Sequence, residues 1–184
     1  MNELKLVIAS DIHGSAFWCE KLISAFDNEK ADKLLLLGDL LYHGPRNPLP
    51  DGYNPQKVFD MLNAVKDKII AVRGNCDSEV DQMVLAFPIM ADYALIDNGN
   101  NTLFATHGHL FSDENPPILK DTDILLNGHF HTPCFKRLQK GYYANCGSVA
   151  LPKNGYPHTY LVVENGELVW VDLETGKEYL REKV

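Results

Sequence analysis

The sequence is poor in cysteine, and its cysteines form no motif. Only four occur in 184 residues, and none belongs to a Cys-x-x-Cys pair: Cys19, Cys76, Cys134 and Cys146. Disulfide frameworks and cysteine-rich zinc sites need cysteines grouped at short spacings. The scattered positions of the four cysteines therefore argue against a disulfide framework and against a cysteine-rich zinc site. They favour a protein of a reducing compartment.

Long apolar runs are absent as well. The first run covers only Leu6 to Ala9 and ends directly at Ser10 and Asp11, so it is too short for a signal-peptide core and lacks a cleavage site. No stretch approaches the roughly 20 apolar residues of a membrane span. We therefore expect a cytoplasmic protein with no membrane partner.

Basic residues are outnumbered by acidic ones. Lysine and arginine total 17 against 25 aspartate and glutamate residues, which gives a formal net charge of −8. Proteins that hold DNA or RNA without regard to sequence usually present a basic face, so we expect no nucleic-acid partner. The chain also lacks internal repeats, low-complexity tracts and linkers, and its 45% hydrophobic content suits one domain over residues 1–184.

Short, almost continuous apolar segments predict strands that are buried on both faces. They cover residues 4–9, 34–37, 69–72, 103–105 and 124–126. Helical patterns separate the first three, which predicts right-handed parallel crossovers. Two hairpins follow, at residues 91–106 and 160–171, so the sheets should be mixed. The pattern predicts an α/β protein with two packed sheets flanked by helices.

Three segments have the spacing of helices. Residues 16–29 carry an apolar stripe, and a second helix should begin at Asn54, a good N-cap residue that is followed by proline. A third is predicted after Asp77 and Ser78, which can cap its N-terminus. Its apolar side chains would be Val80, Met83, Val84 and Phe87. The proline-rich residues 43–55 cannot be regular structure and should form a loop that shapes a pocket.

Side chains that bind metals follow the ends of the apolar segments. They are two carboxylates, four imidazoles and one amide: Asp11, His13, Asp39, Asn75, His107, His129 and His131. The motifs around Asp11, Asp39 and Asn75 each have a plain structural explanation, such as a turn or a helix cap. The grouped histidines at 107–109 and 129–131 are stronger evidence, because structural histidines should scatter. Together the motifs are specific, because ligands bind beyond the carboxyl ends of the strands in open α/β sheets. Carboxylates and imidazoles suit manganese, iron, zinc or cobalt, and pairs of such ions cleave phosphate esters.

Five motifs, in order, resemble those of the calcineurin-like metallophosphoesterases, most closely the small single-domain phosphodiesterases among them. They are Asp11-x-His13, Gly38-Asp39, Gly74-Asn75, His107-Gly108-His109 and Gly128-His129-x-His131. The resemblance extends over nearly the whole chain, as far as the turn at residues 145–148. It implies a four-layer αββα sandwich, with two mixed β-sheets flanked by helices and two divalent metal ions at the sheet edge.

The resemblance also implies how the donors divide between the ions. The first ion would be held by Asp11, His13 and His131. The second would be held by Asn75, His107 and His129, and Asp39 would bridge both. A hydroxide between the ions would attack phosphorus in line with the leaving oxygen. Mn²⁺ is the expected metal, with Fe, Zn, Co and Ni as alternatives.

One residue departs from the wider superfamily. Many members follow the ligating asparagine with a histidine that acts on the leaving group, whereas this chain has Cys76. A thiol is a poor general acid at neutral pH, so packing is the favoured explanation for Cys76, and esters with good leaving groups are the expected substrates.

Two further side chains are candidates for catalysis. His109 could protonate the leaving group or orient His107 through a hydrogen bond. Arg73 could bind a substrate phosphate with its planar guanidinium, or form a surface salt bridge. We place His109 slightly ahead of Arg73.

The leading hypothesis is a metal-dependent phosphoric diester hydrolase that acts on a small phosphodiester. A phosphomonoesterase could use the same two metals. A non-catalytic protein-binding scaffold of the same fold should have lost ligands, and all seven are present. A DNA-repair nuclease would need a nucleic-acid surface that the charge of −8 does not support. Apolar edges on the late hairpins would permit a homo-oligomer.

Overall fold

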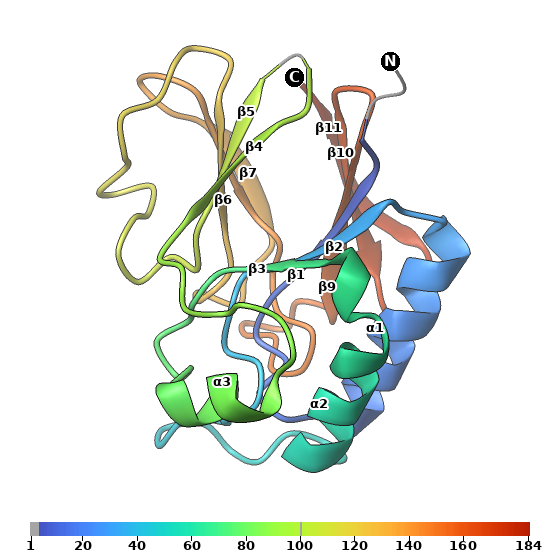
Figure 1. The fold of residues 1–184 in the computed structure, drawn as a ribbon. Coiled ribbons are helices and arrows are strands. Elements are labelled where there is room, and N and C mark those ends of the chain that lie inside the picture. The colour runs from blue at the N-terminus through green and yellow to red at the C-terminus, as the bar shows by residue number, and fades with distance from the viewer. Residues whose placement is uncertain (1–3, 100) are drawn as a thin grey trace.

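The fold consists of two mixed β-sheets, as the computed structural model of residues 4–99 and 101–184 shows (Figure 1). Within these residues, the first sheet has six strands, in the order β11 (Glu178–Lys183), β10 (Glu167–Asp172), β9 (Thr159–Glu164), β1 (Leu6–Ala9), β2 (Lys33–Leu36) and β3 (Ile69–Ala71). The second has five, in the order β4 (Ala94–Asp97), β5 (Thr102–Ala105), β6 (Ile124–Asn127), β8 (Tyr142–Asn145) and β7 (Cys134–Arg137). The α/β class and the mixed pairing confirm the sequence prediction.

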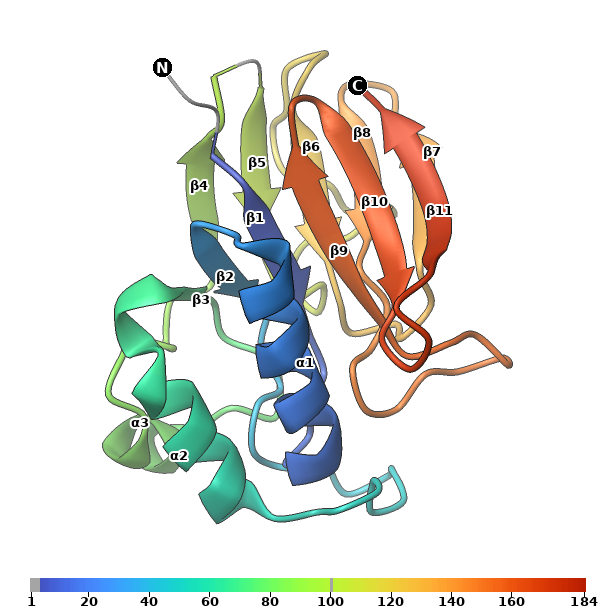
Figure 2. The same cartoon turned by 90° about the vertical axis from the view of Figure 1, so that its right-hand side faces the viewer.

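The first three strands run parallel, as predicted. β1 pairs with β2 and β2 pairs with β3, and the two crossovers contain α1 (Ala16–Glu29) and α2 (Pro55–Ala64), with the short 3₁₀ helix η1 (Lys66–Lys68) before β3. Figure 2 shows α1 lying across the first sheet, with the second sheet behind it. Because these strands are parallel, the loops that follow their carboxyl ends meet at one edge of the sheet.

The first two predicted helices are confirmed. At the start of α1 the Ser15 hydroxyl accepts a hydrogen bond from Trp18 N–H at 3.2 Å, and at the start of α2 Asn54 Oδ1 accepts one from Lys57 N–H at 3.1 Å. The apolar stripe of α1, which includes Leu22, is buried in the core. In the described part of the chain, no helix is both long and apolar enough to cross a membrane.

The third helix, α3 (Glu79–Val84), is shorter than predicted, and its apolar side chains are not buried. Val80 is 69% exposed and Met83 is 82% exposed. Phe87 lies beyond the helix, in a bend, and its side chain enters the core. The Gln82 side chain stabilises this segment through hydrogen bonds with its backbone on both sides of Phe87. The prediction of an amphipathic helix that reaches Phe87 is therefore wrong.

Three strands have no clear apolar pattern in the sequence: β7, β8 and β11. Two of them, β7 and β11, are sheet edges and carry exposed charged residues, as edge strands often do. The layer beyond the second sheet is also not helical, because the irregular residues 106–123 form it (Figure 1). Leu119 of this segment packs against Leu125 and Tyr143 of the sheet.

Apolar side chains from both sheets fill the space between them. Leu6 of the first sheet and Leu103 and Leu126 of the second are completely buried in one cluster. Trp170 on β10 belongs to the same cluster, and its Nε1–H donates to the backbone oxygen of Asn145 on β8 at 2.6 Å. This hydrogen bond joins the two sheets beside the loop that follows β8.

Replacing Trp170 tests this connection between the sheets. Trp170→Phe should lower the free energy of unfolding by about 1–3 kcal/mol, because Asn145 loses a buried donor and a small cavity forms. Urea denaturation followed by circular dichroism measures the change. Tyr179→Phe on the exposed side of β11 is the matched aromatic control, expected to change stability by less than about 0.5 kcal/mol. Equal effects of the two substitutions would contradict the special role of Trp170.

Candidate metal centre

The predicted metal-binding residues all lie on loops at the carboxyl ends of strands. The loops carry them as follows: Asp11 and His13 after β1, Asp39 after β2, Asn75 after β3, His107 after β5, and His129 and His131 after β6. These five strands come from both sheets. The donors therefore meet at the edge where the two sheets adjoin.

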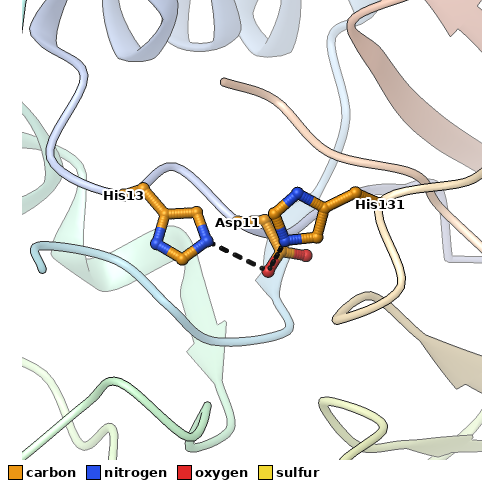
Figure 3. A group of neighbouring side chains, drawn as sticks. All are labelled: Asp11, His13 and His131. Carbon is orange, nitrogen blue, oxygen red and sulfur yellow. Dashed lines mark ion pairs between the residues drawn. The ribbon is translucent and has the colours of Figure 1, made fainter. Parts of the chain in front are cut away.

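The first group of donors is shown in Figure 3. His131 Nε2 lies 3.1 Å and His13 Nε2 lies 3.5 Å from the same oxygen of Asp11, Oδ1. All three side chains are buried. The two rings thus point at one carboxylate oxygen from two different loops, as the sequence predicts for the first ion.

The second group is arranged around His107. Its Nε2 lies 3.1 Å from Asn75 Oδ1 and 3.2 Å from His129 Nδ1. Asp39 Oδ2 lies 3.5 Å from His107 Nε2 and 3.7 Å from His13 Nε2. Asp39 therefore lies between the two groups, in the position that the sequence analysis expects for a bridging carboxylate.

Hydrogen bonds to the backbone orient three of the four rings. His13 Nδ1 lies 2.8 Å from the backbone oxygen of Tyr42, and His107 Nδ1 lies 2.7 Å from that of Leu37. The Nδ1 of His131 makes the same kind of bond. A proton on each Nδ1 leaves the lone pair of Nε2 directed at the centre, which is how metal-binding histidines are usually held.

Two buried atoms of the predicted ligands have no hydrogen-bond partner among residues 4–99 and 101–184. They are Asp11 Oδ1 and His13 Nε2. An unsatisfied buried polar atom costs about 1–3 kcal/mol, and a cation between these two atoms would remove that cost. The donors are carboxylate and amide oxygens and imidazole nitrogens, which together suit divalent ions of the manganese-to-zinc series. The side chains present thus fit the two-metal expectation.

Five of the donors have a left-handed backbone. The φ angles are 59° at Asp11, 48° at His13, 56° at Asp39, and 61° at both His129 and His131. This conformation is uncommon for residues other than glycine, and backbone strain of this kind concentrates at functional sites. Contacts between the loops hold it, since the amides of Asp11 and His13 donate to the backbone oxygens of residues 38 and 39 at 3.1 and 2.9 Å.

A carboxylate that the sequence analysis assigns to helix capping holds two of these loops together. Asp77 is buried and accepts hydrogen bonds from the backbone N–H groups of Asp39, Leu40 and Gly74, at 2.8, 2.9 and 2.8 Å. The N-cap of α3 is Ser78 alone. The two loops come so close together that a Cβ at Gly74 would lie 2.1 Å from Asp39 Oδ1. Only glycine, which has no Cβ, fits at this position.

The charged groups of the centre shift each other's pKa. Burial alone would raise the pKa of Asp11, but the charge of His131 helps to lower it well below its usual value. Burial lowers the pKa of His107, yet the hydrogen bond to Asp39 and the charge of Asp11 raise it to about 9. Burial and the charge of His107 lower the pKa of His129 to about 4. Both carboxylates are therefore ionised at neutral pH, and the centre attracts positive charge.

The two candidate catalytic residues have different surroundings. The Arg73 guanidinium donates to Asp92 Oδ1 from Nη2 at 2.7 Å and from Nε at 3.1 Å. Arg73 therefore forms a surface salt bridge, the second of the two roles considered for it in the sequence analysis. His109 is half-buried beside the donors, with its ring centre 5.4 Å from that of His107, and its Nδ1 has no hydrogen-bond partner in the described part of the chain. Unlike Arg73, His109 forms no ion pair among the described residues.

Cys76 faces the centre. Its sulfur lies within 4.8 Å of a ring nitrogen of His13 and a carboxylate oxygen of Asp39. Burial and the charge of Asp39 raise the pKa of the thiol, so it is protonated at neutral pH. Its backbone N–H donates to Asp39 Oδ1 at 2.8 Å, which helps to orient that carboxylate.

A cavity of about 300 Å³ opens onto the donors. The residues that line it include five of the seven predicted ligands, residues 44–47 of the proline-rich loop (Arg46 among them) and Lys153. This confirms that the loop shapes a pocket. The sequence analysis did not single out Arg46 or Lys153, and no local pattern around Lys153 could have done so. Larger hollows of about 610 and 560 Å³ along α1 contain none of the predicted ligands.

Two mixed sheets with carboxylate and imidazole donors at their common edge form the arrangement expected of a metallophosphoesterase. The sequence matches the calcineurin-like phosphoesterase superfamily domain over residues 4–167, and the chain belongs to this superfamily. Superfamily membership implies divalent metal ions, in agreement with the donor groups described above.

Several known proteins are similar to this chain. Phosphodiesterase YfcE of Escherichia coli K12 is 49% identical over 165 residues, which cover 90% of each protein. The structure of YfcE, a phosphoesterase from E. coli, superimposes with a TM-score of 0.96 at 45% identity and covers 98% of this chain and 100% of that one. Vps29 of Entamoeba histolytica, in complex with Zn²⁺, has a TM-score of 0.65 at 17% identity over 98% of both chains, and this likeness is one of fold alone.

Asp77→Asn tests whether this carboxylate positions the donor loops. The amide would present N–H groups where backbone donors already point, so the free energy of unfolding should fall by about 1–3 kcal/mol and metal affinity should fall by about tenfold or more. Urea denaturation and titration calorimetry with Mn²⁺ measure the two effects. Asp121→Asn, an exposed change of the same kind, is the control. Unaltered metal affinity in Asp77→Asn would rule out the positioning role.

Proposed function

We propose that the protein is a metal-dependent phosphodiesterase that hydrolyses a small phosphodiester at the centre described above. The observation that carries the proposal is the position of Asp39, within 3.7 Å of a ring nitrogen from each of the two donor groups. A carboxylate so placed can bridge two cations. The similarity to phosphodiesterase YfcE over 90% of the chain supports the diester as the substrate.

The proposed ligands divide as the sequence analysis expects. Asp11, His13 and His131 hold one ion, Asn75, His107 and His129 hold the other, and Asp39 is shared. When bound, two divalent ions would polarise the phosphoryl oxygens and supply a hydroxide nucleophile from water at neutral pH for attack on phosphorus in line with the leaving oxygen. Mn²⁺ is the metal that we propose.

Residues of the chain balance the charge of the proposed ions and orient the histidine rings. The carboxylates of Asp11 and Asp39 offset the positive charge of the ions, and the backbone carbonyls hold the rings so that Nε2 faces inward. His109 is the side chain that we propose to contact the leaving group. Arg73 is a weaker candidate, because the ion pair with Asp92 occupies its guanidinium.

A phosphomonoesterase is the alternative within the same chemistry, since the same two ions can serve either ester. A non-catalytic scaffold would have lost donors, whereas all seven converge here. The absence of a nucleic-acid partner, a cytoplasmic location and a homo-oligomer remain predictions from the sequence.

Asp39→Asn and His129→Ala should each reduce hydrolysis more than about a hundredfold. The first removes the negative charge and one oxygen of the proposed bridging carboxylate, and the second removes a ring nitrogen donor. The loops lie outside the core, so circular dichroism should remain that of the wild type. A chelator should abolish activity, and added Mn²⁺ should restore it. Asp60→Asn on the exposed face of α2 is the control. Full activity of either ligand variant would refute the two-metal proposal.

A panel of esters tests the substrate class and the consequence of Cys76. With Mn²⁺ present, kcat/KM should be higher for aryl phosphodiesters than for the corresponding monoesters. It should also be higher for aryl than for alkyl diesters, because a thiol does not replace a histidine that assists the leaving group. Steady-state kinetics across the panel measures both comparisons. Equal rates for aryl and alkyl diesters would contradict the second expectation, and a preference for monoesters would favour the alternative function.

A further inference from the structure

The cavity of the metal centre is lined by two cationic side chains to which the proposed mechanism gives no role. Arg46 belongs to the loop after β2, and Lys153 belongs to the loop after β8. The ion pairs found among the described residues all involve other cations. Both side chains are exposed, so their charged groups are available to a molecule that enters the cavity.

The backbone that carries these two side chains is held against the centre. The Lys153 N–H donates to the backbone oxygen of His131 at 3.2 Å. Two residues before Arg46, a Cβ at Gly44 would lie 3.3 Å from the sulfur of Cys76, so this loop packs directly on the centre. The two cations therefore keep their place beside the donors while their long side chains can adjust to a ligand.

The surplus of positive charge at this cavity contrasts with the rest of the molecule. The chain has a net charge of −8, yet the charged residues that line the cavity beyond the metal donors are Arg46 and Lys153. A simple phosphodiester has one negative charge, and the proposed metal ions already balance it. Two more cations match a substrate with a second anionic group.

We propose that Arg46 and Lys153 bind a second phosphate group of the substrate, so that the preferred substrate is a small phosphodiester that carries an additional phosphate. The inference rests on the proposed phosphodiesterase function. The guanidinium of Arg46 offers paired N–H donors to phosphate oxygens, and Lys153 adds a compact charge. Because the second phosphate does not react, these contacts act equally before and during the reaction and should change KM more than kcat.

The test uses the Mn²⁺-loaded protein and two substrates that differ by one phosphate: the p-nitrophenyl ester of thymidine 5′-phosphate, without and with a 3′-phosphate. The wild type should prefer the 3′-phosphorylated ester by about tenfold in kcat/KM. Arg46→Gln and Lys153→Gln should each reduce this preference about threefold, and the double variant should remove it, mainly through KM. Lys140→Gln, in the turn before β8 and so at the opposite end of that strand, should keep the wild-type preference.

Titration calorimetry with thymidine 3′,5′-bisphosphate and thymidine 5′-phosphate gives a second measure that does not depend on turnover. Wild-type protein should bind the bisphosphate more tightly, and the double variant should bind both alike. If the double variant keeps the wild-type preference in kinetics and in binding, the inference is overturned. If the wild type hydrolyses neither ester, the proposed function fails, and calorimetry alone then decides the role of the two cations.

Discussion

The burial of two carboxylates at the edge between the sheets is the constraint on which the rest of the centre depends. Oxygens of Asp11 and Asp39 and a nitrogen of His107 all lie within 4.8 Å of one another. Removing carboxylates from water costs several kcal/mol for each unless opposite charges and hydrogen bonds offset it. Backbone N–H groups of His129 and Cys76 provide part of the offset. Under the proposed function, divalent cations would offset the rest of the cost of burying these carboxylates. The same ions would then both stabilise the centre and serve its chemistry.

The same constraint explains the local backbone. Side chains from five loops can approach one another only if the loops turn sharply as soon as the strands end, and left-handed donor residues make these turns in the loops after β1, β2 and β6. Such strain persists when surrounding contacts outweigh it. Asp77 supplies three of these contacts and, with the glycine at position 74, makes the loops after β2 and β3 a single unit.

The fold of this chain and its chemistry rest on different residues. A likeness at a TM-score of 0.65 and 17% identity describes how the sheets pack, but it says nothing of what enters the cavity. The chemistry depends on a few side chains at the ends of the strands. In this chain the candidates are the seven predicted donors, the thiol of Cys76, and the two cations Arg46 and Lys153 that line the cavity.

The sequence by itself determined the parallel strands and the first two helices, and it singled out the seven predicted donors, because each depends on residues that are neighbours along the chain. Apolar runs predict strands through burial, and polar residues at their ends predict the loops where ligands bind. The edge strands β7 and β11 were missed because exposed charged residues mask that pattern.

Only the tertiary structure decided which distant groups meet. It paired Arg73 with Asp92, placed Asp77 on the amides of another loop rather than on a helix, and brought Lys153 to the cavity of Arg46. These contacts join residues far apart in sequence. The contact of Asp77 follows from the parallel pairing of β2 and β3, and the other two placements follow from how the two sheets pack. No pattern within a short segment of the chain records them.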